Sequence, residues 1–290
     1  MMKKLFTFFL IISVILMSLA SASAKSVMTI GDWTVEKTDN NDFSIVSCSS
    51  DKSQISVIKE IGDLDVTAIG EYAFAGSKTI QTLTAFAPLK EIGAYAFQNA
   101  AKLYEVSLPN TVKRIGAFAF AGTSALQTIN LEDTSIGVIP AYAFMSSGLQ
   151  NIVLPKYCTQ IANNAFLNCR ALKTIYIPET VTKIGEKTFD GCENLTILCS
   201  KNSYAEKFAK SHNLDSKSAV LCGDADKDGL ITIMDATVIQ RVIVNVPVTS
   251  FDLDAGDVDG EGLDITDATQ IQRYLVSVPI PNLVGEITTI

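Results

Sequence analysis

A repeat of about 23 residues runs through the middle of this chain and constrains its fold more than any other feature. The clearest anchor of the repeat is an isoleucine followed five positions later by a phenylalanine. Six copies occur in register: Ile69/Phe74, Ile92/Phe97, Ile115/Phe120, Ile139/Phe144, Ile161/Phe166 and Ile184/Phe189. Successive isoleucines are 23, 23, 24, 22 and 23 residues apart. A fixed period in this range is typical of a stacked repeat array.

Each anchor is followed by a segment in which apolar and polar residues alternate, as in Leu126-x-x-Ile129-x-Leu131. This alternation predicts a short strand with one buried face, and a proline such as Pro155 ends several of these strands. One unit cannot bury its own apolar face, whereas stacked units can, so the repeats predict a leucine-rich-repeat solenoid. The Ala-Phe segments are expected to pack beneath each strand as a short turn or helix.

The unit Ile184-Gly-Glu-Lys-Thr-Phe189-Asp-Gly-Cys192-Glu-Asn-Leu195 resembles the BspA-type (treponemal-type) leucine-rich repeat of bacterial surface proteins. The resemblance covers residues 66–200. It implies a β-rich N-terminal cap over residues 25–65, with its clearest part from Trp33 to Asp65. It also implies that the solenoid domain, residues 66–215, is closed by a helix at Ser203–Lys210. Terminal units are expected to differ from the others because they present a polar end to water.

The strand residues between the buried ones are expected to face the concave side of the solenoid, where such arrays bind partners. An ordinary solvated face is the alternative, and the mild composition of the stripe identifies no ligand. The stripe consists of Thr82, Thr84, Glu105, Ser107, Thr128, Asn130, Asn151, Val153, Thr174 and Tyr176.

Six cysteines occur: Cys48, Cys158, Cys169, Cys192, Cys199 and Cys222. Cys169 and Cys192 occupy the same repeat position and are therefore expected to stack as neighbours. They are interpreted as small buried core residues, with a disulfide bond between them as the alternative.

Acidic residues are concentrated at the C-terminus. From Gly223 onward there are twelve acidic and three basic residues, whereas the preceding part of the mature chain is nearly neutral. An acidic block of this kind disfavours binding to nucleic acid and indicates bound cations. The change in composition divides the chain near residue 220.

Residues 224–235 have the spacing of a calcium-binding loop. Three aspartates take positions 1, 3 and 5, a glycine follows at the sharp turn, and a fourth aspartate closes the loop. The expected ligands are Asp224, Asp226, Asp228, Leu230 through its backbone carbonyl, Thr232 and Asp235.

A second loop follows about 33 residues later and is one residue shorter. If the missing residue lies just after Gly262, Asp264 falls at position 9. The expected ligands here are Asp257, Asp259, Glu261, Asp264 and Asp267. Two calcium ions are therefore predicted, one in each loop.

Each loop leads into an amphipathic helix, Asp235-Ala-Thr-x-Ile239-Gln-Arg241 or Asp267-Ala-Thr-x-Ile271-Gln-Arg273, and no helical pattern precedes either loop. A duplicated calcium loop with only a following helix resembles the type I dockerin, over residues 222–280. The fold class predicted for the chain is thus an α+β repeat solenoid followed by a small all-α calcium-binding dockerin module, residues 216–290 with a C-terminal tail. Ile239 and Ile271 are expected in the core of that module.

The dockerin resemblance implies calcium-dependent attachment to a cohesin domain on a scaffoldin. Cohesin contact is expected at the end of each loop and on the exposed face of each helix, and the twofold similarity lets either repeat face the partner. The residues carried over by position are Ile233, Met234, Gln240 and Arg241 in the first repeat, and Ile265, Thr266, Gln272 and Arg273 in the second.

The first 24 residues have the pattern of a signal peptide. Lys3 and Lys4 precede an apolar run from Leu5 to Leu19, and Ala22-Ser-Ala24 provides small residues for cleavage. The chain is therefore expected to be secreted, and to be held at a cell surface through a scaffoldin with no membrane span after cleavage.

Three function classes remain after these observations. The first is a non-catalytic cellulosome component whose solenoid recognises a protein or a carbohydrate. The second is a cell-surface adhesin that binds host or neighbouring-cell protein. The third, a polysaccharide hydrolase, is disfavoured because a glycosidase needs two carboxylates across a cleft, and acids such as Glu105 and Glu132 are scattered. The chain is therefore not expected to be an enzyme.

Overall fold

The structure is a computed structural model that describes residues 26–86, 88–226, 233–275 and 287–289. The predicted signal peptide, residues 1–24, lies outside these ranges. Within them, no helix has the length and apolar character needed to cross a bilayer.

The N-terminal segment is a small β-structure that leads into the solenoid. Its first three strands form an antiparallel sheet, the third pairs in parallel with β6, and β5 pairs with β6 in antiparallel fashion. The strands are β1 (Val27–Ile30), β2 (Trp33–Lys37), β3 (Phe43–Cys48), β5 (Glu60–Ile61) and β6 (Leu64–Ile69).

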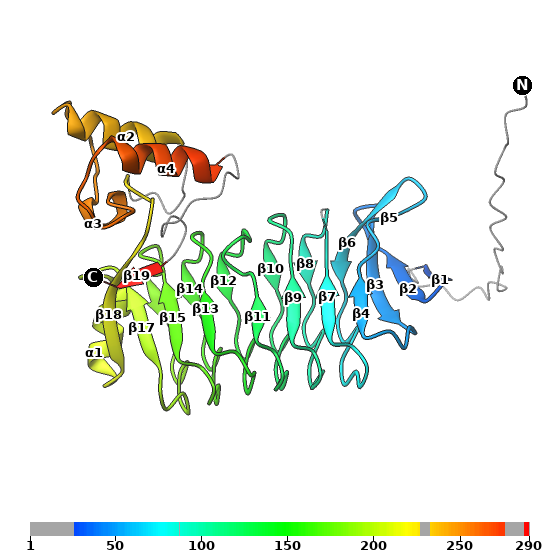
Figure 1. Cartoon of the computed structure of the whole chain (residues 1–290). Coiled ribbons are helices and arrows are strands. Elements are labelled where there is room, and N and C mark those ends of the chain that lie inside the picture. The colour runs from blue at the N-terminus through cyan, green and yellow to red at the C-terminus, as the bar shows by residue number, and fades with distance from the viewer. Residues whose placement is uncertain (1–25, 87, 227–232, 276–286, 290) are drawn as a thin grey trace, which may run out of the picture.

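Two ladders of short parallel strands run along the solenoid (Figure 1). The first ladder contains β4 (Gln54–Ser56), β7 (Thr82–Thr84), β9 (Glu105–Ser107), β11 (Thr128–Ile129), β13 (Asn151–Val153), β15 (Thr174–Ile177) and β17 (Thr196–Cys199). The second contains β8 (Glu91–Ile92), β10 (Arg114–Ile115), β12 (Val138–Ile139), β14 (Gln160–Ile161) and β16 (Lys183–Ile184). Within each ladder a strand pairs with its counterpart one repeat later, except that the pairing is interrupted between β11 and β13 and between β10 and β12. The central apolar residue of each three-residue strand, such as Val106 or Ile152, is buried, as the alternation predicts.

The anchor phenylalanines form a continuous stack through the core. Rings of successive repeats from Phe74 to Phe189 lie nearly parallel, with centroids 5.1, 5.2, 5.4, 5.3 and 5.8 Å apart. Trp33 closes one end of this stack and Phe208 the other, both with their rings edge-on. Phe208 lies on α1 (Tyr204–Ser211), whose N-cap Ser203 accepts a hydrogen bond from the backbone of Glu206.

The Ala-Phe segments are turns and not helices. Their backbone groups bond to the next repeat, since Phe97 N–H donates to Ala119 O at 2.8 Å and Phe120 N–H to Ala143 O at 2.8 Å. Residues such as Tyr95 and Phe118 also have φ values near +59°, which interrupts helical geometry. Stacking against neighbouring repeats therefore decides the turn.

All six cysteines are free thiols in the structure. Cys169 Sγ donates to Phe144 O at 2.9 Å, and Cys192 Sγ donates to Phe166 O at 3.2 Å. Both side chains are buried within the solenoid core, which favours the interpretation of this pair as core residues.

The C-terminal part begins as an extension of the solenoid sheet. β18 (Asp215–Leu221) pairs in parallel with β17, so the predicted boundary at residue 216 falls within this strand. The helices α2 (Ile233–Ile243), α3 (Leu253–Gly256) and α4 (Ile265–Leu275) follow, and α2 packs against α4 (Figure 1). β19 (Ile287–Thr289) then pairs with β18, which adds a strand to a segment expected to be all-helical.

The helices surround a second, smaller core that is separate from that of the solenoid. Ile239 and Ile271 are fully buried in it, which confirms the expectation that they are core residues. Smaller apolar residues, including Cys222, Ala236 and Val258, complete it. A core of this size offers limited apolar burial for holding the two helices together.

Candidate functional site: two acidic clusters

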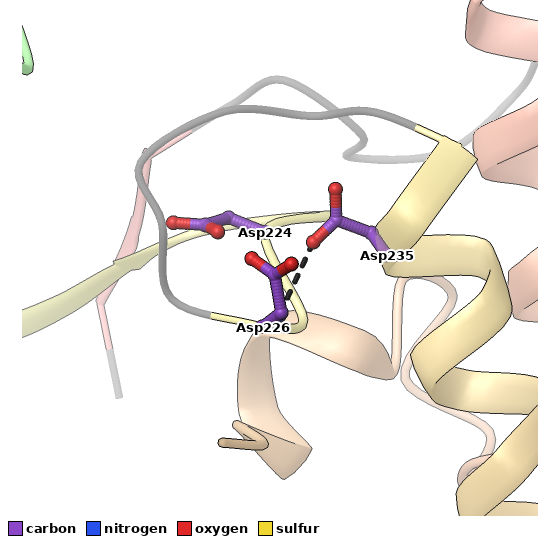
Figure 2. A group of neighbouring side chains, drawn as sticks. All are labelled: Asp224, Asp226 and Asp235. Carbon is purple, nitrogen blue, oxygen red and sulfur yellow. Dashed lines mark hydrogen bonds between the residues drawn. The ribbon is translucent and has the colours of Figure 1, made fainter. Parts of the chain in front are cut away.

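The first acidic cluster lies where β18 leads toward α2. One carboxylate oxygen from each of Asp224, Asp226 and Asp235 lies within 4.8 Å of the others (Figure 2). Asp235 stands in the first turn of α2 and is fully buried, and its Oδ1 accepts a hydrogen bond from the Asp226 backbone N–H at 3.1 Å. The structure thus brings together three of the six ligands predicted for the first loop. The other three, Asp228, Leu230 and Thr232, lie outside the described residues.

The second cluster repeats this arrangement at the start of α4. Carboxylate oxygens of Asp257, Asp259 and Asp267 lie within 4.8 Å of one another, and Asp267 is fully buried. Its Oδ1 accepts from the Val258 backbone N–H at 2.9 Å. That donor occupies the second position of its loop, whereas Asp226 occupies the third of the first loop. Because the second loop is one residue shorter, the backbone N–H that binds its closing aspartate comes one position earlier in the loop than in the first loop.

Two predicted ligands of the second loop lie outside the cluster. Asp264 is exposed, and its Oδ1 accepts a hydrogen bond from the Thr266 backbone N–H at 2.5 Å, so it acts as the N-cap of α4. This hydrogen bond lowers the pKa of Asp264. Glu261 is also exposed. The side chains that converge in the second loop are therefore the three aspartates at its start and end.

The start of the first loop is hydrogen-bonded through its backbone to the segment that precedes the second loop. Gly223 N–H donates to Ala255 O at 2.7 Å, and Asp252 N–H donates to Ala225 O at 2.9 Å. These bonds place the start of the first loop beside α3, immediately before the second loop. The pair of clusters therefore forms one structural unit.

Each cluster fits a hard divalent cation. Calcium is bound by six to eight oxygens, and three converging carboxylates supply the charged part of such a set. Burial raises the pKa of Asp267, because removal from water disfavours its charged form. A bound cation would favour the charged carboxylates and neutralise their mutual repulsion.

The residues predicted to contact a cohesin lie along α2 and α4, and Ile233, Met234, Ile265 and Thr266 are in the first turns next to the closing aspartates. Ile233 and Met234 are each 54% exposed, and Ile265 is 57% exposed. Thr266, Arg241 and Arg273 are exposed, while Gln240 and Gln272 are half-buried. Val244, which follows α2, is a further exposed apolar residue, at 65% exposure, and is not among the predicted contact residues.

Nine of the ten residues predicted for the concave face lie on strands of the first ladder, and Asn130 directly follows β11. Glu105, Thr128 and Asn151 are exposed and the other seven are half-buried. Thr82 pairs with Glu105, which pairs with Thr128, and Asn151 pairs with Thr174, so the side chains are aligned across repeats. Burial raises the pKa of Tyr176 to about 12, with a further contribution from the Asp224 carboxylate.

An open hollow of about 590 Å³ lies at one edge of the same ladder. Its charged residues are two cations, Arg170 and Lys173, and Gln150, Thr174, Asn194 and Thr196 add amide and hydroxyl groups. β17 follows Leu195 directly, so this repeat lacks the residue that corresponds to Lys173.

The comparisons with known proteins concern the repeat region. Residues 67–196 match the model described as "BspA type Leucine rich repeat region" in six copies. No curated protein matches the chain.

Solved structures share the solenoid fold. A leucine rich cell surface protein of Faecalibacterium prausnitzii is 24% identical, with a TM-score of 0.50 over 62% of this chain and 56% of that one. The leucine-rich-repeat protein of Treponema pallidum is 20% identical, with a TM-score of 0.55 over 77% of this chain and 97% of that one. A leucine-rich repeat protein of Bacteroides ovatus is 23% identical, with a TM-score of 0.54 over 65% and 52% of the two chains.

The matches to the F. prausnitzii and B. ovatus proteins span little more than half of those proteins' lengths. The repeat period, the two strand ladders and the family match agree on the same stretch of sequence. Residues 67–196 therefore form a leucine-rich-repeat solenoid whose sequence matches the BspA-type model.

Proposed function

We propose that this chain is a secreted, non-catalytic binding protein that attaches through a calcium-dependent dockerin to a cohesin on a scaffoldin, in a polysaccharide-degrading cellulosome. The observation that supports this proposal is the pair of acidic clusters, each at the start of a helix and each beside an exposed apolar residue. The repeat solenoid acts as the recognition module for a protein or carbohydrate ligand. Calcium orders the loops that present the docking surface.

Replacing the exposed apolar residues of both repeats is expected to abolish cohesin binding. Ile233→Asp with Met234→Asp disables one face, and Ile265→Asp disables the other. Because either repeat can face the partner, each change alone should leave binding nearly intact, whereas the triple variant should lose at least about 100-fold in affinity. Calorimetry of the chain against a panel of cohesins, with calcium present, measures this loss.

The matched control is Leu253→Asp, because Leu253 is 56% exposed but lies on α3, outside the predicted contact surface. It should bind as the unmodified chain does. Absence of binding to every cohesin by a calcium-loaded, folded chain would contradict the docking proposal. Loss of binding in each single-face variant would contradict the two interchangeable faces.

A cell-surface adhesin is the second candidate function. It is favoured by the similarity of the solenoid to a protein described as a leucine rich cell surface protein. In this case the solenoid binds host or neighbouring-cell protein, and the C-terminal module supplies attachment to the surface. The two candidates differ in the ligand of the solenoid.

The ligand of the solenoid is expected to carry negative charge at the hollow beside β15. Arg170→Glu with Lys173→Glu should weaken its binding about tenfold or more, because these two cations are the charged residues that line the hollow. Binding to arrays of polysaccharides and of surface proteins identifies the ligand, and titration of both chains measures the change. Lys90→Glu, an exposed substitution elsewhere on the solenoid, is the control. Equal binding by all variants would show that the ligand contacts another surface.

A further inference from the structure

The second acidic cluster contains a buried amide that the calcium-loop pattern does not include. Gln270 lies on α4, only 7% exposed, and its Nε2 donates to Asp259 Oδ2 at 3.2 Å. Its Oε1 is buried and has no hydrogen-bond partner among the described residues. An unsatisfied buried carbonyl oxygen costs about 1–3 kcal/mol, so its presence needs a physical reason.

The position of Gln270 directs its side chain toward the same cluster as the closing aspartate. It follows Asp267 by three residues, and residues three apart lie on one face of a helix. The first helix has Val238 in the corresponding position, three residues after Asp235, and there it packs into the small core. The repeat with the shorter loop therefore has Gln270 at the position where the other repeat has Val238.

Two of the five ligands predicted for the second loop lie outside its cluster. Asp264 is engaged as the N-cap of α4, and Glu261 lies outside the group formed by Asp257, Asp259 and Asp267. Three carboxylates provide fewer ligands than the six to eight that calcium prefers. The second site therefore has room for another oxygen ligand.

We infer that Gln270 completes the second cation site, with its Oε1 as a calcium ligand that replaces an oxygen missing from the shortened loop. Without the cation, the NH₂ group faces Asp259, because an amide oxygen would repel the carboxylate. Rotation of the amide about its terminal bond exchanges the two groups and directs Oε1 toward the cation. The bound cation then gives the buried Oε1 the partner that it lacks among the described residues. This inference depends on the proposal that the acidic clusters bind calcium.

Calcium titration of the intact secreted chain by calorimetry tests the inference. Asp224→Ala serves as the background, because it disables the first loop and leaves the second as the measured site. In this background, Gln270→Leu should weaken calcium binding about 10-fold or more, since it retains side-chain size but removes the oxygen. Gln270→Glu should bind calcium at least as tightly as the background, because it retains an oxygen and adds negative charge.

Thr269→Val is the matched control on the same helix. Its hydroxyl donates to Ile265 O, outside the cluster, so calcium affinity should not change. If Gln270→Glu weakens binding as much as Gln270→Leu, the amide acts only as a donor that positions Asp259, and the inference is wrong. Unchanged affinity in Gln270→Leu also overturns it.

The first loop separates failure of the inference from failure of the proposed function. In the unmodified chain with both loops intact, absence of any calcium binding overturns both. Binding at the first loop, tested in an Asp257→Ala background, combined with unchanged binding in Gln270→Leu, overturns only the role of Gln270.

Discussion

Chelation of calcium is expected to unfold the C-terminal module while the solenoid stays folded. Far-UV circular dichroism of the secreted chain should lose the helical signal of α2 and α4 in chelator and keep the β-sheet signal. The reason is that each cluster holds three carboxylates within 4.8 Å, one of them in the first turn of a helix, and the two helices share only a small core. Without a cation the carboxylates repel one another, and metal binding contributes directly to the folding free energy.

The size of this effect follows from mass action. At a calcium concentration 1,000 times the dissociation constant, one site stabilises the folded module by about 4 kcal/mol. Asp224→Ala combined with Asp257→Ala should therefore reproduce the effect of the chelator in the presence of calcium. It should also abolish cohesin binding.

The control for the double variant is Asp254→Ala. Asp254 is exposed in the first turn of α3 and belongs to neither cluster. It should retain calcium-dependent helicity. Helicity that is the same with calcium and with chelator would contradict the coupling between metal binding and folding.

Truncation of one ring in the phenylalanine stack is expected to have the largest effect on the solenoid itself. Phe120→Ala should lower the free energy of unfolding by about 3–5 kcal/mol, because it removes a fully buried ring and leaves a cavity. Phe120 stacks on Phe97 at 5.2 Å and on Phe144 at 5.4 Å, so the cavity interrupts the stack between two repeats. Denaturant unfolding followed by near-UV circular dichroism measures the change.

Phe118→Ala provides a matched control, two residues away in the same turn. Phe118 also stacks between two rings, Tyr95 at 4.9 Å and Tyr142 at 4.5 Å, but it is only half-buried. Its loss should cost about 1 kcal/mol, the scale of an aromatic contact without a buried cavity. Equal losses in the two variants would show that stacking, and not burial in the core, stabilises the array.

The sequence alone was sufficient to predict the solenoid because its determinants are regular spacings. An isoleucine and a phenylalanine recurring about every 23 residues, followed by an alternating strand segment, have one arrangement that buries every apolar face. The acidic loops are equally local. Asp224, Asp226 and Asp235 are brought together by the spacing of twelve residues and by the start of one helix.

The tertiary structure decided the features that depend on contacts between segments. The Ala-Phe segments are turns because their N–H groups bond to the next repeat, and no local pattern distinguishes that from a short helix. β19 pairs with β18 across more than sixty residues of sequence. Asp264 caps α4 and so lies outside the cluster, although its loop position is that of a ligand. Gln270 reaches Asp259 from a helix, outside the loop where ligands are sought. Spacing along the chain determines which residues recur, whereas the packing of helices and repeats determines which polar atoms face one another.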